Sequence, residues 1–351
     1  MIGAALRATH HAHTGAQRPE PRKAPGAPNN ITALPLPPPP NLNRPQTMGE
    51  MVGQTSLLAQ LKTVMRGSIL RGVPMAHVLV DGPPGFGKTS IANVIAKEFG
   101  GELHVLQGPL LRRPQDLIGV LLRLTVGDVL LIDEVHAASK PVLETLYGAL
   151  EDRSVSLLLG SGADSRAHVA HLPFFVCVAA TTAPGQLPEP FRARFGVKLS
   201  MESYSVAELA QVVANAWTRK GVVFASTEPT TIAERCKGTP RLALHLSERC
   251  LDWVACQGRS TVLPGDCAAA LESFDIDPSG WDAVDRRIIL ALVTVFAGRA
   301  IGISALSQAV GLDQSALESR EGPMVAAGLI TRTARGRMAL SPSYDLVRSW
   351  E

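Results

Sequence analysis

Short apolar runs alternate with helical spacings of apolar residues once the chain has passed residue 44. Residues 76–80, 128–132 and 174–180 are apolar runs of strand length, which is typical of strands buried on both faces. After the first of these runs, apolar residues recur at helical spacing over residues 91–99, and Gly100 follows as a stop signal. This alternation predicts an α/β domain in which helices cover a parallel sheet.

Strand signals fade after residue 200, and amphipathic helical patterns replace them. Three such patterns predict a small all-helical domain: residues 207–218, 230–236 and 241–256. A third unit begins near residue 276 with three helical patterns and ends in two strand-like runs joined by a turn at Gly336, and its segments are residues 282–296, 304–310, 314–327, 329–333 and 337–340. Three helices followed by a hairpin predict a winged-helix module.

The N-terminal segment has a different composition from the rest of the chain. Ten of the 26 prolines fall within residues 1–45, and large apolar residues are scarce there. Such a segment cannot bury enough apolar surface to offset its ordering entropy, so we expect a disordered tail. The predicted organisation is a tail at 1–43, an α/β domain at 44–200, a helical domain at 201–275 and a winged helix at 276–351.

The charge of the chain is concentrated in the predicted tail. The net charge is +3, and the tail accounts for it with Arg7, Arg18, Arg22 and Lys23 against Glu20. The folded part is therefore neutral, and any contact with nucleic acid must come from a local patch or from a channel formed by assembly.

Neither the cysteines nor the apolar segments indicate an extracellular or membrane protein. The five cysteines are odd in number and include no C-x-x-C pair, which argues against a disulfide framework or a zinc site. No run of 18 apolar residues occurs, and the apolar start of the chain is too short for a signal peptide. We expect a cytoplasmic protein without a membrane partner.

A phosphate-binding loop follows the first predicted strand and opens a predicted helix. The segment fits G-x-x-x-x-G-K-[ST], and this strand-loop-helix context is the one that the motif requires. Its glycines let backbone N–H groups face the phosphates of ATP, Lys88 neutralises them, and the Thr89 hydroxyl is a ligand for Mg²⁺. The predicted nucleotide contacts are Gly82, Pro83, Pro84, Gly85, Phe86, Gly87, Lys88, Thr89 and the adjacent Ser90.

Two acidic residues end the second predicted strand, at the edge where ligands of such sheets bind. In this Walker B pattern Asp133 is a predicted Mg²⁺ ligand, and Glu134 is predicted to orient or polarise the attacking water. An acidic pair after a strand also serves as a helix N-cap, but the preceding phosphate loop favours the catalytic interpretation. His136 is either a group that supports this site or a polar surface residue.

The acidic pair resembles the AAA+ branch of P-loop ATPases, and further motifs resemble the bacterial RuvB family of Holliday junction branch-migration motors. The match spans about residues 44–345, and its motifs occur in that family's order and spacing: Arg44-Pro45, Gly53-Gln54, residues 82–89, residues 133–136, residues 180–182, residues 192–196, residues 238–241 and residues 333–337. The resemblance implies an AAA+ P-loop domain, a helical lid and a winged helix. It also implies a hexameric ring that drives duplex or branched DNA.

The resemblance implies two catalytic roles outside the phosphate loop. Thr182 resembles sensor 1, whose hydroxyl contacts the γ-phosphate, although a polar residue also commonly ends a buried strand. Arg194 resembles the arginine finger that reaches a neighbour's ATP, and Arg192 is the weaker candidate. As isolated residues these arginines would be surface side chains.

Three further residues are implied nucleotide contacts. Arg241 resembles sensor 2, placed at the first turn of a lid helix by Pro240. Its alternative is a plain helix start. Tyr204 resembles the family's adenine neighbour, with a core tyrosine as the alternative, and Arg44 belongs to the motif at the start of the match.

Two segments are candidate partner surfaces. Residues 154–172 contain two extended runs around a polar turn, and the family docks its partner RuvA on such a hairpin. A hairpin packed on its own domain is the alternative. Arg332, Arg335 and Arg337 surround Gly336 and are predicted to contact DNA phosphates, with a solvated charged turn as the alternative.

The sequence therefore predicts an ATPase that migrates Holliday junctions in recombination and repair with a RuvA-like partner. A clamp-loader-like or protein-remodelling AAA+ factor, or a nucleotide-gated DNA-binding regulator, remains the alternative. The chain departs from the family in its tail, in Ala137-Ala138 and in residues 323–325, and these departures leave the ATPase motifs intact.

Overall fold

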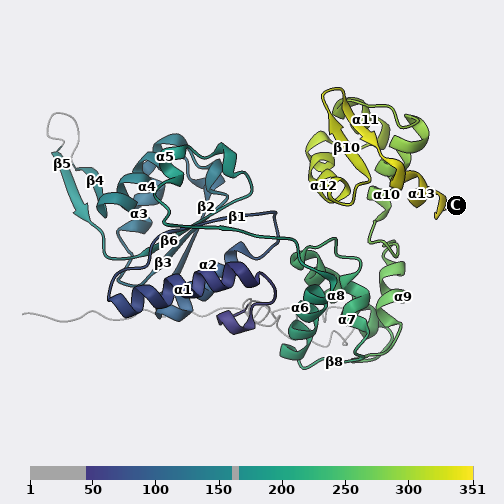
Figure 1. The fold of residues 1–351 in the computed structure, drawn as a ribbon, viewed down its shortest axis with the longest axis horizontal. Coiled ribbons are helices and arrows are strands. Elements are labelled where there is room, and N and C mark those ends of the chain that lie inside the picture. The colour runs from purple at the N-terminus through teal and green to yellow at the C-terminus, as the bar shows by residue number, and fades with distance from the viewer. Residues whose placement is uncertain (1–44, 160–165, 351) are drawn as a thin grey trace, which may run out of the picture. The chain divides into compact units, whose positions relative to one another are not determined.

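The structure of the chain is a computed structural model that describes residues 45–159 and 166–350. The predicted tail and Arg44 lie outside the described residues. Short 3₁₀ helices occur at Met48–Glu50, Gly108–Leu110, Val135–Ala137 and Pro184–Gln186. Up to Ser200 the longer elements are, in order (Figure 1), α1 (Thr55–Arg71), β1 (Val78–Asp81), α2 (Lys88–Phe99), β2 (Leu103–Gln107), α3 (Pro114–Leu121), β3 (Val129–Asp133), α4 (Lys140–Asp152), β4 (Ser154–Leu159), β5 (Arg166–His171), β6 (Val176–Thr181), α5 (Glu189–Arg192) and β7 (Val197–Ser200).

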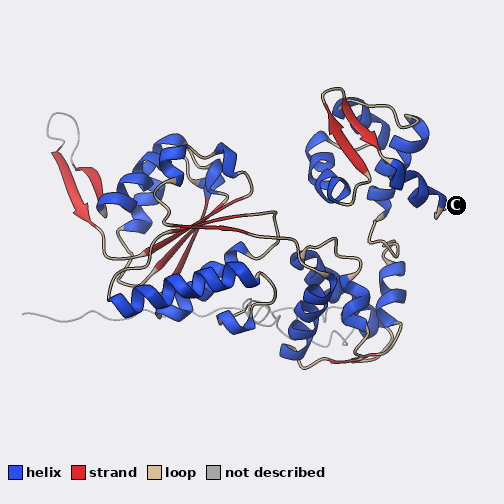
Figure 2. Cartoon of the chain, viewed as in Figure 1, coloured by secondary structure: helices blue, strands red, loops and turns tan. Residues whose placement is uncertain are grey.

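Five parallel strands form the central sheet in the order β2-β3-β6-β1-β7. Figure 2 shows helices on both faces of this sheet. Side chains of β1 alternate between the two cores, because Val78 and Val80 pack in one cluster and Leu79 packs in the other. Burial on both faces explains why the strands are continuous apolar runs. The predicted α/β fold is confirmed.

Strand β2 was not predicted from the pattern of apolar residues. It lies at the edge of the sheet beside β3, and Leu103, Val105 and Gln107 are not fully buried. An edge strand needs fewer apolar residues than a central one, so its sequence carries a weaker strand signal.

The parallel topology gathers the carboxyl ends of the strands at one edge. The register pairs Asp81 at the end of β1 with Thr181 at the end of β6, and Gln107 of β2 with Asp133 of β3. The phosphate loop, the acidic pair and the 180–182 segment therefore meet at one place. This edge is the position where ligands of open α/β sheets bind.

The middle part of the chain is mainly helical, as predicted, but it is not all-helical, because residues 223–224 and 261–262 pair as two short parallel strands. Helix α6 begins after Ser205, whose hydroxyl accepts a hydrogen bond from the Glu208 N–H, while the Glu208 carboxylate accepts from the Ser205 N–H. This capping box satisfies N–H groups that a helix start leaves free. Its elements are α6 (Val206–Arg219), β8 (Val223–Phe224), α7 (Glu228–Ala233), α8 (Pro240–Cys256), β9 (Thr261–Val262) and α9 (Asp266–Ser273).

The C-terminal part is a winged helix, also as predicted. The helix predicted over residues 282–296 divides into α10 and a π-helical turn. The predicted turn position is wrong by one or two residues, because the hairpin turns at Ala334-Arg335 and Gly336 already pairs with Thr333. The elements are α10 (Ala283–Leu290), the π turn (Ala291–Val295), α11 (Ile303–Val310), α12 (Gln314–Ala326), β10 (Ile330–Thr333), β11 (Gly336–Ala339) and α13 (Ser341–Arg348).

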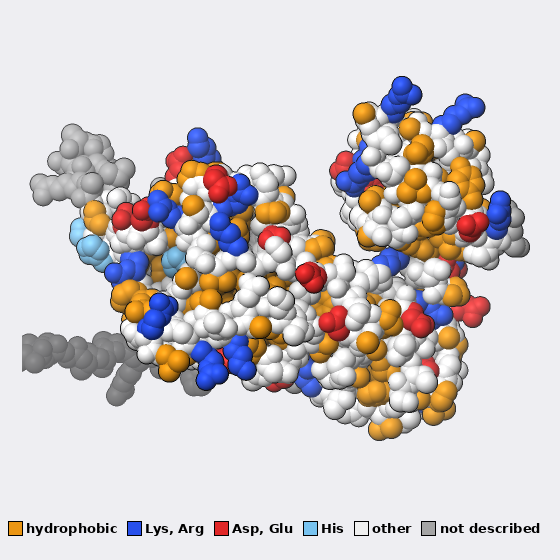
Figure 3. Space-filling view, in the orientation of Figure 1, with side chains coloured by type: hydrophobic (Ala, Val, Ile, Leu, Met, Phe, Trp, Pro, Cys, Tyr) orange, Lys and Arg blue, Asp and Glu red, His pale blue; other side chains and the backbone are white. Residues whose placement is uncertain are grey.

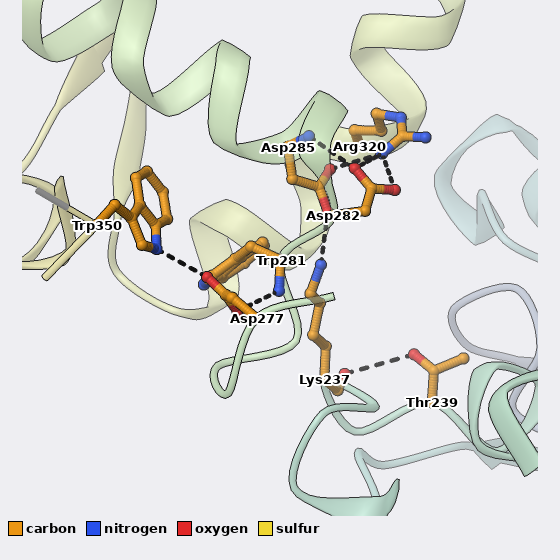
Figure 4. A network of polar contacts seen from close by, with 8 residues as sticks. All are labelled: Lys237, Thr239, Asp277, Trp281, Asp282, Asp285, Arg320 and Trp350. Atoms are coloured by element: carbon orange, nitrogen blue, oxygen red, sulfur yellow. Dashed lines mark hydrogen bonds and ion pairs between the residues drawn. The ribbon is translucent and has the colours of Figure 1, made fainter. Parts of the chain in front are cut away.

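Lys237 joins the helical part to the winged helix. Its Nζ lies 2.7 Å from Oδ2 of Asp285 on α10 and 3.8 Å from the centre of the Trp281 ring (Figure 4). Arg320 on α12 contacts Oδ1 of Asp285 at 2.8 Å, so this buried carboxylate is neutralised from both sides. Buried charges are stable only when they are paired in this way. The contact therefore links the loop before α8 to the first helix of the winged helix.

Among residues 45–159 and 166–350, no helix has the length and apolar character needed to cross a lipid bilayer.

Candidate active site

The phosphate loop connects the buried strand β1 to the N-terminus of α2. Gly85 and Gly87 adopt φ values of +83° and +103°, which residues with a Cβ rarely adopt. A Cβ on Gly85 would also lie 2.8 Å from Cβ of Arg241, so only glycine fits there. Helix α2 begins at Lys88 directly after this turn, so its free N–H groups face the loop and favour an anion.

Lys88 is held by the loop itself. Its Nζ donates to the carbonyl oxygens of Gly82 at 2.7 Å and Pro83 at 3.0 Å. Burial lowers the pKa of Lys88, and the carboxylates of Glu134 and Asp133 oppose that shift. The cation is therefore fixed inside the loop, where it can meet phosphate oxygens without a large rearrangement.

Asp133 and Glu134 follow β3 at the same edge of the sheet. The Glu134 N–H donates to Oδ1 of Asp133 at 3.1 Å, and Glu134 has a φ of +50°. A non-glycine residue in this left-handed region costs free energy, and such strain is common at functional sites. A Cβ on Gly108 would lie 2.0 Å from the carbonyl oxygen of Glu134, so a glycine there is required.

The Glu134 carboxylate contacts two side chains. Thr182 donates its hydroxyl hydrogen to Oε2 of Glu134 at 2.9 Å, and Nδ1 of His136 lies 3.3 Å from the same oxygen. His136 Nδ1 also lies 2.9 Å from Oγ1 of Thr181, whose side chain is fully buried. His136 is only 16% exposed, so it supports the acidic pair and is not a polar surface residue.

Two residues that follow the sheet in sequence close over the loop. The Arg241 N–H donates to the Gly85 carbonyl oxygen at 3.2 Å, and the Tyr204 hydroxyl donates to the Phe86 carbonyl oxygen at 3.1 Å. The ring of Tyr204 meets that of Phe86 edge to face, and burial raises the pKa of Tyr204 to about 12. The Tyr204 phenol is therefore neutral and donates a hydrogen bond to the backbone of the loop.

A cavity of about 660 Å³ lies against the loop. Of the predicted residues, it is lined by Pro84, Gly85, Phe86, Gly87, Lys88, Thr89, Ser90, Asp133, Glu134, Tyr204 and Arg241. Gly82 and Pro83 instead bind Lys88 through their carbonyl oxygens, and Thr182 binds Glu134. Arg44 lies outside the described residues. One cavity therefore gathers side chains from the loop, β3 and the helical part.

The cavity also has lining residues that the motifs did not predict. Arg219 in the last turn of α6 adds a second cation from the helical part, and Gln107 at the end of β2 adds an amide. No local pattern marks these two residues, because only the packing of α6 and β2 brings them to the cavity. The other unpredicted lining residues are Pro45, Glu50, Met51, Val52, Val105, Val212, Asn215, Pro240 and Leu244.

Thr89 and Asp133, the predicted metal ligands, line the same cavity. Outside the masked segments, the chain has no group of three or more His, Cys, Asp or Glu side chains suited to a metal ion. Mg²⁺ at nucleotide sites uses one or two protein oxygens and takes its other ligands from phosphate and water, so this donor set fits it.

Arg194 is not among the described residues that line the cavity. Its guanidinium hydrogen-bonds to the hydroxyl of Tyr147, stacks 4.4 Å from the centre of that ring and lies 2.7 Å from Oε2 of Glu151. The hydrogen bond to Tyr147, with a further contribution from Glu151, raises the pKa of Arg194. Arg192 pairs with Glu189 on its own short helix. Arg194 therefore remains charged beside α4 and does not line the cavity of its own chain.

The predicted partner hairpin consists of β4 and β5, which pair antiparallel from Ser154 opposite His171 to Leu159 opposite Arg166. Its tip, residues 160–165, lies outside the described residues. Val155 is buried against the domain, whereas Val169 is 52% exposed. The base of the hairpin therefore packs on its own domain, and the other strand presents an exposed apolar side chain.

The three wing arginines differ in their surroundings. Arg332 and Arg337 lie opposite each other on β10 and β11, and both bind the carboxylate of Glu321, which is 1% exposed. Arg335 occupies the turn and is exposed. Figure 3 shows Lys and Arg side chains projecting from this part of the chain. Arg337 is directed toward the buried carboxylate, because its Nε donates to Oε1 of Glu321 at 2.6 Å.

Three family models match successive parts of the chain. Residues 43–201 match the Holliday junction DNA helicase RuvB P-loop domain, residues 204–277 match the RuvB AAA lid domain, and residues 278–348 match the RuvB C-terminal winged helix domain.

Relatives and solved structures agree with these matches. The chain is 39% identical to the Holliday junction branch migration complex subunit RuvB of Pseudarthrobacter chlorophenolicus over 302 residues. The aligned region covers 86% of this chain and 84% of that protein. It is 41% identical over 303 residues to the subunit of the same name from Saccharopolyspora erythraea, covering 86% of each. The Thermotoga maritima RuvB Holliday junction branch migration motor superposes with a TM-score of 0.76 at 32% identity, covering 88% of this chain and 98% of that one. The chain therefore belongs to the RuvB family of Holliday junction branch-migration P-loop ATPases.

Proposed function

We propose that this chain works as the ATP-driven motor that migrates Holliday junctions during recombination and repair in the cytoplasm. The observation that carries the proposal is the single cavity that joins Lys88, the acidic pair and Arg241 in a chain of the RuvB family. The proposed domains are residues 44–200 for ATP hydrolysis, 201–275 for the lid and 276–351 for DNA contact.

In this proposal each predicted site residue has one task. Lys88 and the N-terminus of α2 neutralise the phosphates, and Glu134 orients and polarises the attacking water. Thr182 and Arg241 contact the γ-phosphate, Tyr204 contacts the adenine, and Arg44 is a further nucleotide contact. Thr89 and Asp133 would hold Mg²⁺, which supplies positive charge to the phosphate oxygens when bound. The left-handed Glu134 and the loop glycines support these roles, since both are typical of preorganised sites.

We further propose that the chain works as a ring, with a hexamer as the expected size, and that Arg194 acts on the ATP of a neighbouring subunit. Arg194 is charged and lies outside its own cavity, which supports a role between subunits. A ring also provides a channel for duplex DNA, which the neutral folded part needs because it lacks a long-range attraction for DNA.

The β4–β5 hairpin is the proposed docking site for a RuvA-like protein. The half-exposed Val169 beside the buried base of the hairpin supports this proposal, because a partner that covers an exposed apolar side chain removes it from water.

For DNA contact, we propose Arg335 as the main phosphate ligand of the wing. Arg332 and Arg337 both pair with the buried Glu321 carboxylate, although the Arg332 side chain is still 55% exposed, and Arg335 lies exposed at the turn itself. Phosphate contacts do not read the base sequence, so the motor remains free to move along the duplex.

Replacing Arg335 with alanine is expected to lower the slope of log K against log[salt] for duplex binding by about 0.9, the value for one phosphate contact. ATPase activity without DNA should not change. Arg348→Ala is the matched control, because Arg348 is also an exposed arginine of the winged helix but pairs with Asp345 on α13. An equal slope for both variants and the parent would show that Arg335 does not contact phosphate.

The experiment that tests the proposed function compares ATPase activity without DNA, with linear duplex and with a four-way junction, each with and without a RuvA-type protein. Conversion of the junction to two duplexes is measured in the same samples. ATP-dependent conversion that requires the partner is the expected result. ATP hydrolysis without conversion would favour a protein-remodelling or clamp-loader-like factor, and DNA binding without turnover would favour a regulator.

A further inference from the structure

We propose that His136 is a positioning residue for ATP hydrolysis, held by the buried Thr181 so that its ring orients the Glu134 carboxylate. This inference rests on the proposed role of Glu134. It adds a pair of residues, His136 and Thr181, that act on the carboxylate from the side of the sheet.

The first step is that Thr181 anchors the His136 ring. Thr181 is the last residue of β6, and its hydroxyl oxygen accepts a hydrogen bond from the Ala183 N–H at 3.0 Å. The same oxygen lies 2.9 Å from Nδ1 of His136. Because Thr181 is fully buried in a central strand, its hydroxyl cannot move far, and it fixes the imidazole ring relative to the sheet.

The second step is the tautomer of His136. Nδ1 lies between two oxygens, the Thr181 hydroxyl at 2.9 Å and Oε2 of Glu134 at 3.3 Å. A bare nitrogen lone pair facing an ionised carboxylate would be repelled, whereas an N–H in that position is attracted to both oxygens. The arrangement therefore favours the tautomer with hydrogen on Nδ1, which donates to the Thr181 hydroxyl and lies beside the Glu134 carboxylate.

The third step concerns Thr182, the other group on this carboxylate. Its hydroxyl donates to Oε2 of Glu134 at 2.9 Å and carries only one hydrogen. If Thr182 donates that hydrogen to a γ-phosphate, as its proposed role requires, the contact with Glu134 is lost. His136 is then the remaining described side chain in contact with the carboxylate oxygen. It holds Glu134 at the moment when orientation matters for hydrolysis.

The backbone makes this support necessary. Glu134 has a φ of +50°, and a short 3₁₀ helix, Val135–Ala137, follows it and carries His136. The Ala137 N–H donates to the Glu134 carbonyl oxygen at 2.9 Å, which closes this turn. A side chain on a strained turn needs contacts that fix its rotamer, because a shift of about 1 Å can lower a rate by about 10²-fold.

The test is a set of variants at position 136, measured for kcat, for nucleotide affinity and for thermal unfolding. His136→Ala is expected to lower kcat by about 10- to 10²-fold while the affinity for ATP stays within about twofold, because orientation acts on the transition state rather than on binding. His136→Asn is expected to recover most of the rate, because its amide nitrogen can occupy the position of Nδ1. His136→Gln carries its amide one carbon farther out and is expected to behave like the alanine variant.

A variant of Thr181 is the second part of the experiment. Thr181→Val keeps the shape of the side chain and removes the hydroxyl, so it is expected to lower kcat in the parental chain. It should have little further effect when His136 is already alanine, because the two residues act through one contact.

His104→Ala is the matched control for loss of a histidine–carboxylate contact. His104 on β2 lies 3.2 Å from Asp128, the residue just before β3, so this variant alters the same sheet at the end that does not line the cavity. It should leave kcat unchanged, even if it lowers the unfolding temperature.

Parental kcat in His136→Ala, or equally low rates in the alanine, asparagine and glutamine variants, would overturn the inference. A kcat loss that only follows a loss of folded protein, as judged against His104→Ala, would also overturn it. Failure of the proposed function has a different signature, because Glu134→Gln would then hydrolyse ATP at the parental rate whatever residue stands at position 136.

Discussion

Replacing Lys88 with alanine is expected to lower the affinity for ATP by about 10²-fold or more, because hydrogen bonds to charged groups contribute about 1.5–3 kcal/mol each. Replacing Glu134 with glutamine is expected to preserve binding and lower kcat by about 10²- to 10⁴-fold, the usual contribution of a positioned proton acceptor. The reason for the difference is geometric. Lys88 lies within the loop that receives the phosphates, whereas Glu134 is held across the cavity by Thr182 and His136.

A fluorescent nucleotide titration measures the first effect, and phosphate release under saturating ATP measures the second. Lys97→Ala is the matched control, because Lys97 is an exposed lysine in the last turn of the same helix α2. If Glu134→Gln hydrolysed ATP at the parental rate, the Walker B assignment would be wrong. Unaltered ATP affinity in Lys88→Ala would exclude Lys88 as a phosphate ligand.

Arg194→Ala is expected to lower ATPase activity by about 10³-fold or more, in the range measured for arginine fingers. The Arg194 guanidinium contacts Tyr147 and Glu151 of α4, and it does not line the nucleotide cavity of its own chain. Its effect should therefore depend on a neighbouring subunit. An arginine in that position stabilises charge that develops on the phosphates of the other site.

Mixing two inactive variants measures this dependence. Rings that contain both Arg194→Ala and Lys88→Ala chains have some interfaces with an intact loop and an intact Arg194, so part of the ATPase activity should return. Arg192→Ala is the neighbouring control and should retain activity, since Arg192 pairs with Glu189 on its own helix. Verified mixed rings that regain no activity would count against a role in trans.

Short-range patterns predicted most of the fold. The buried strands β1, β3 and β6 are continuous apolar runs, and α6 and α8 carry helical periodicity with clear start signals. The edge strand β2 and the terminal helix α13 were not predicted, because short, partly exposed elements need little apolar sequence. The winged helix was predicted in outline, but its turn was placed at Gly336 instead of Ala334-Arg335.

For the candidate active site, too, local motifs were predicted and residues brought in by packing were missed. Glycines, a lysine and a threonine within eight residues identified the phosphate loop, and two acidic residues after a strand identified the second motif, since these functions depend on local backbone geometry. The contributions of Arg219 and Gln107 to the cavity were missed, because α6 and β2 bring them there through packing.

The sequence by itself determined the order of elements and the two nucleotide motifs, because both depend on residues that are neighbours in the chain. Only the tertiary structure decided which charged side chains pair with one another. Glu321 is buried and pairs with both Arg332 and Arg337, so two of the three predicted DNA contacts also neutralise a carboxylate, while Arg335 lies exposed at the turn. In the same way His136 became a partner of Glu134 because β6 places Thr181 beside it. Burial and pairing depend on contacts between residues far apart in sequence, and these contacts decide whether a charged or polar group binds a ligand or holds the fold together.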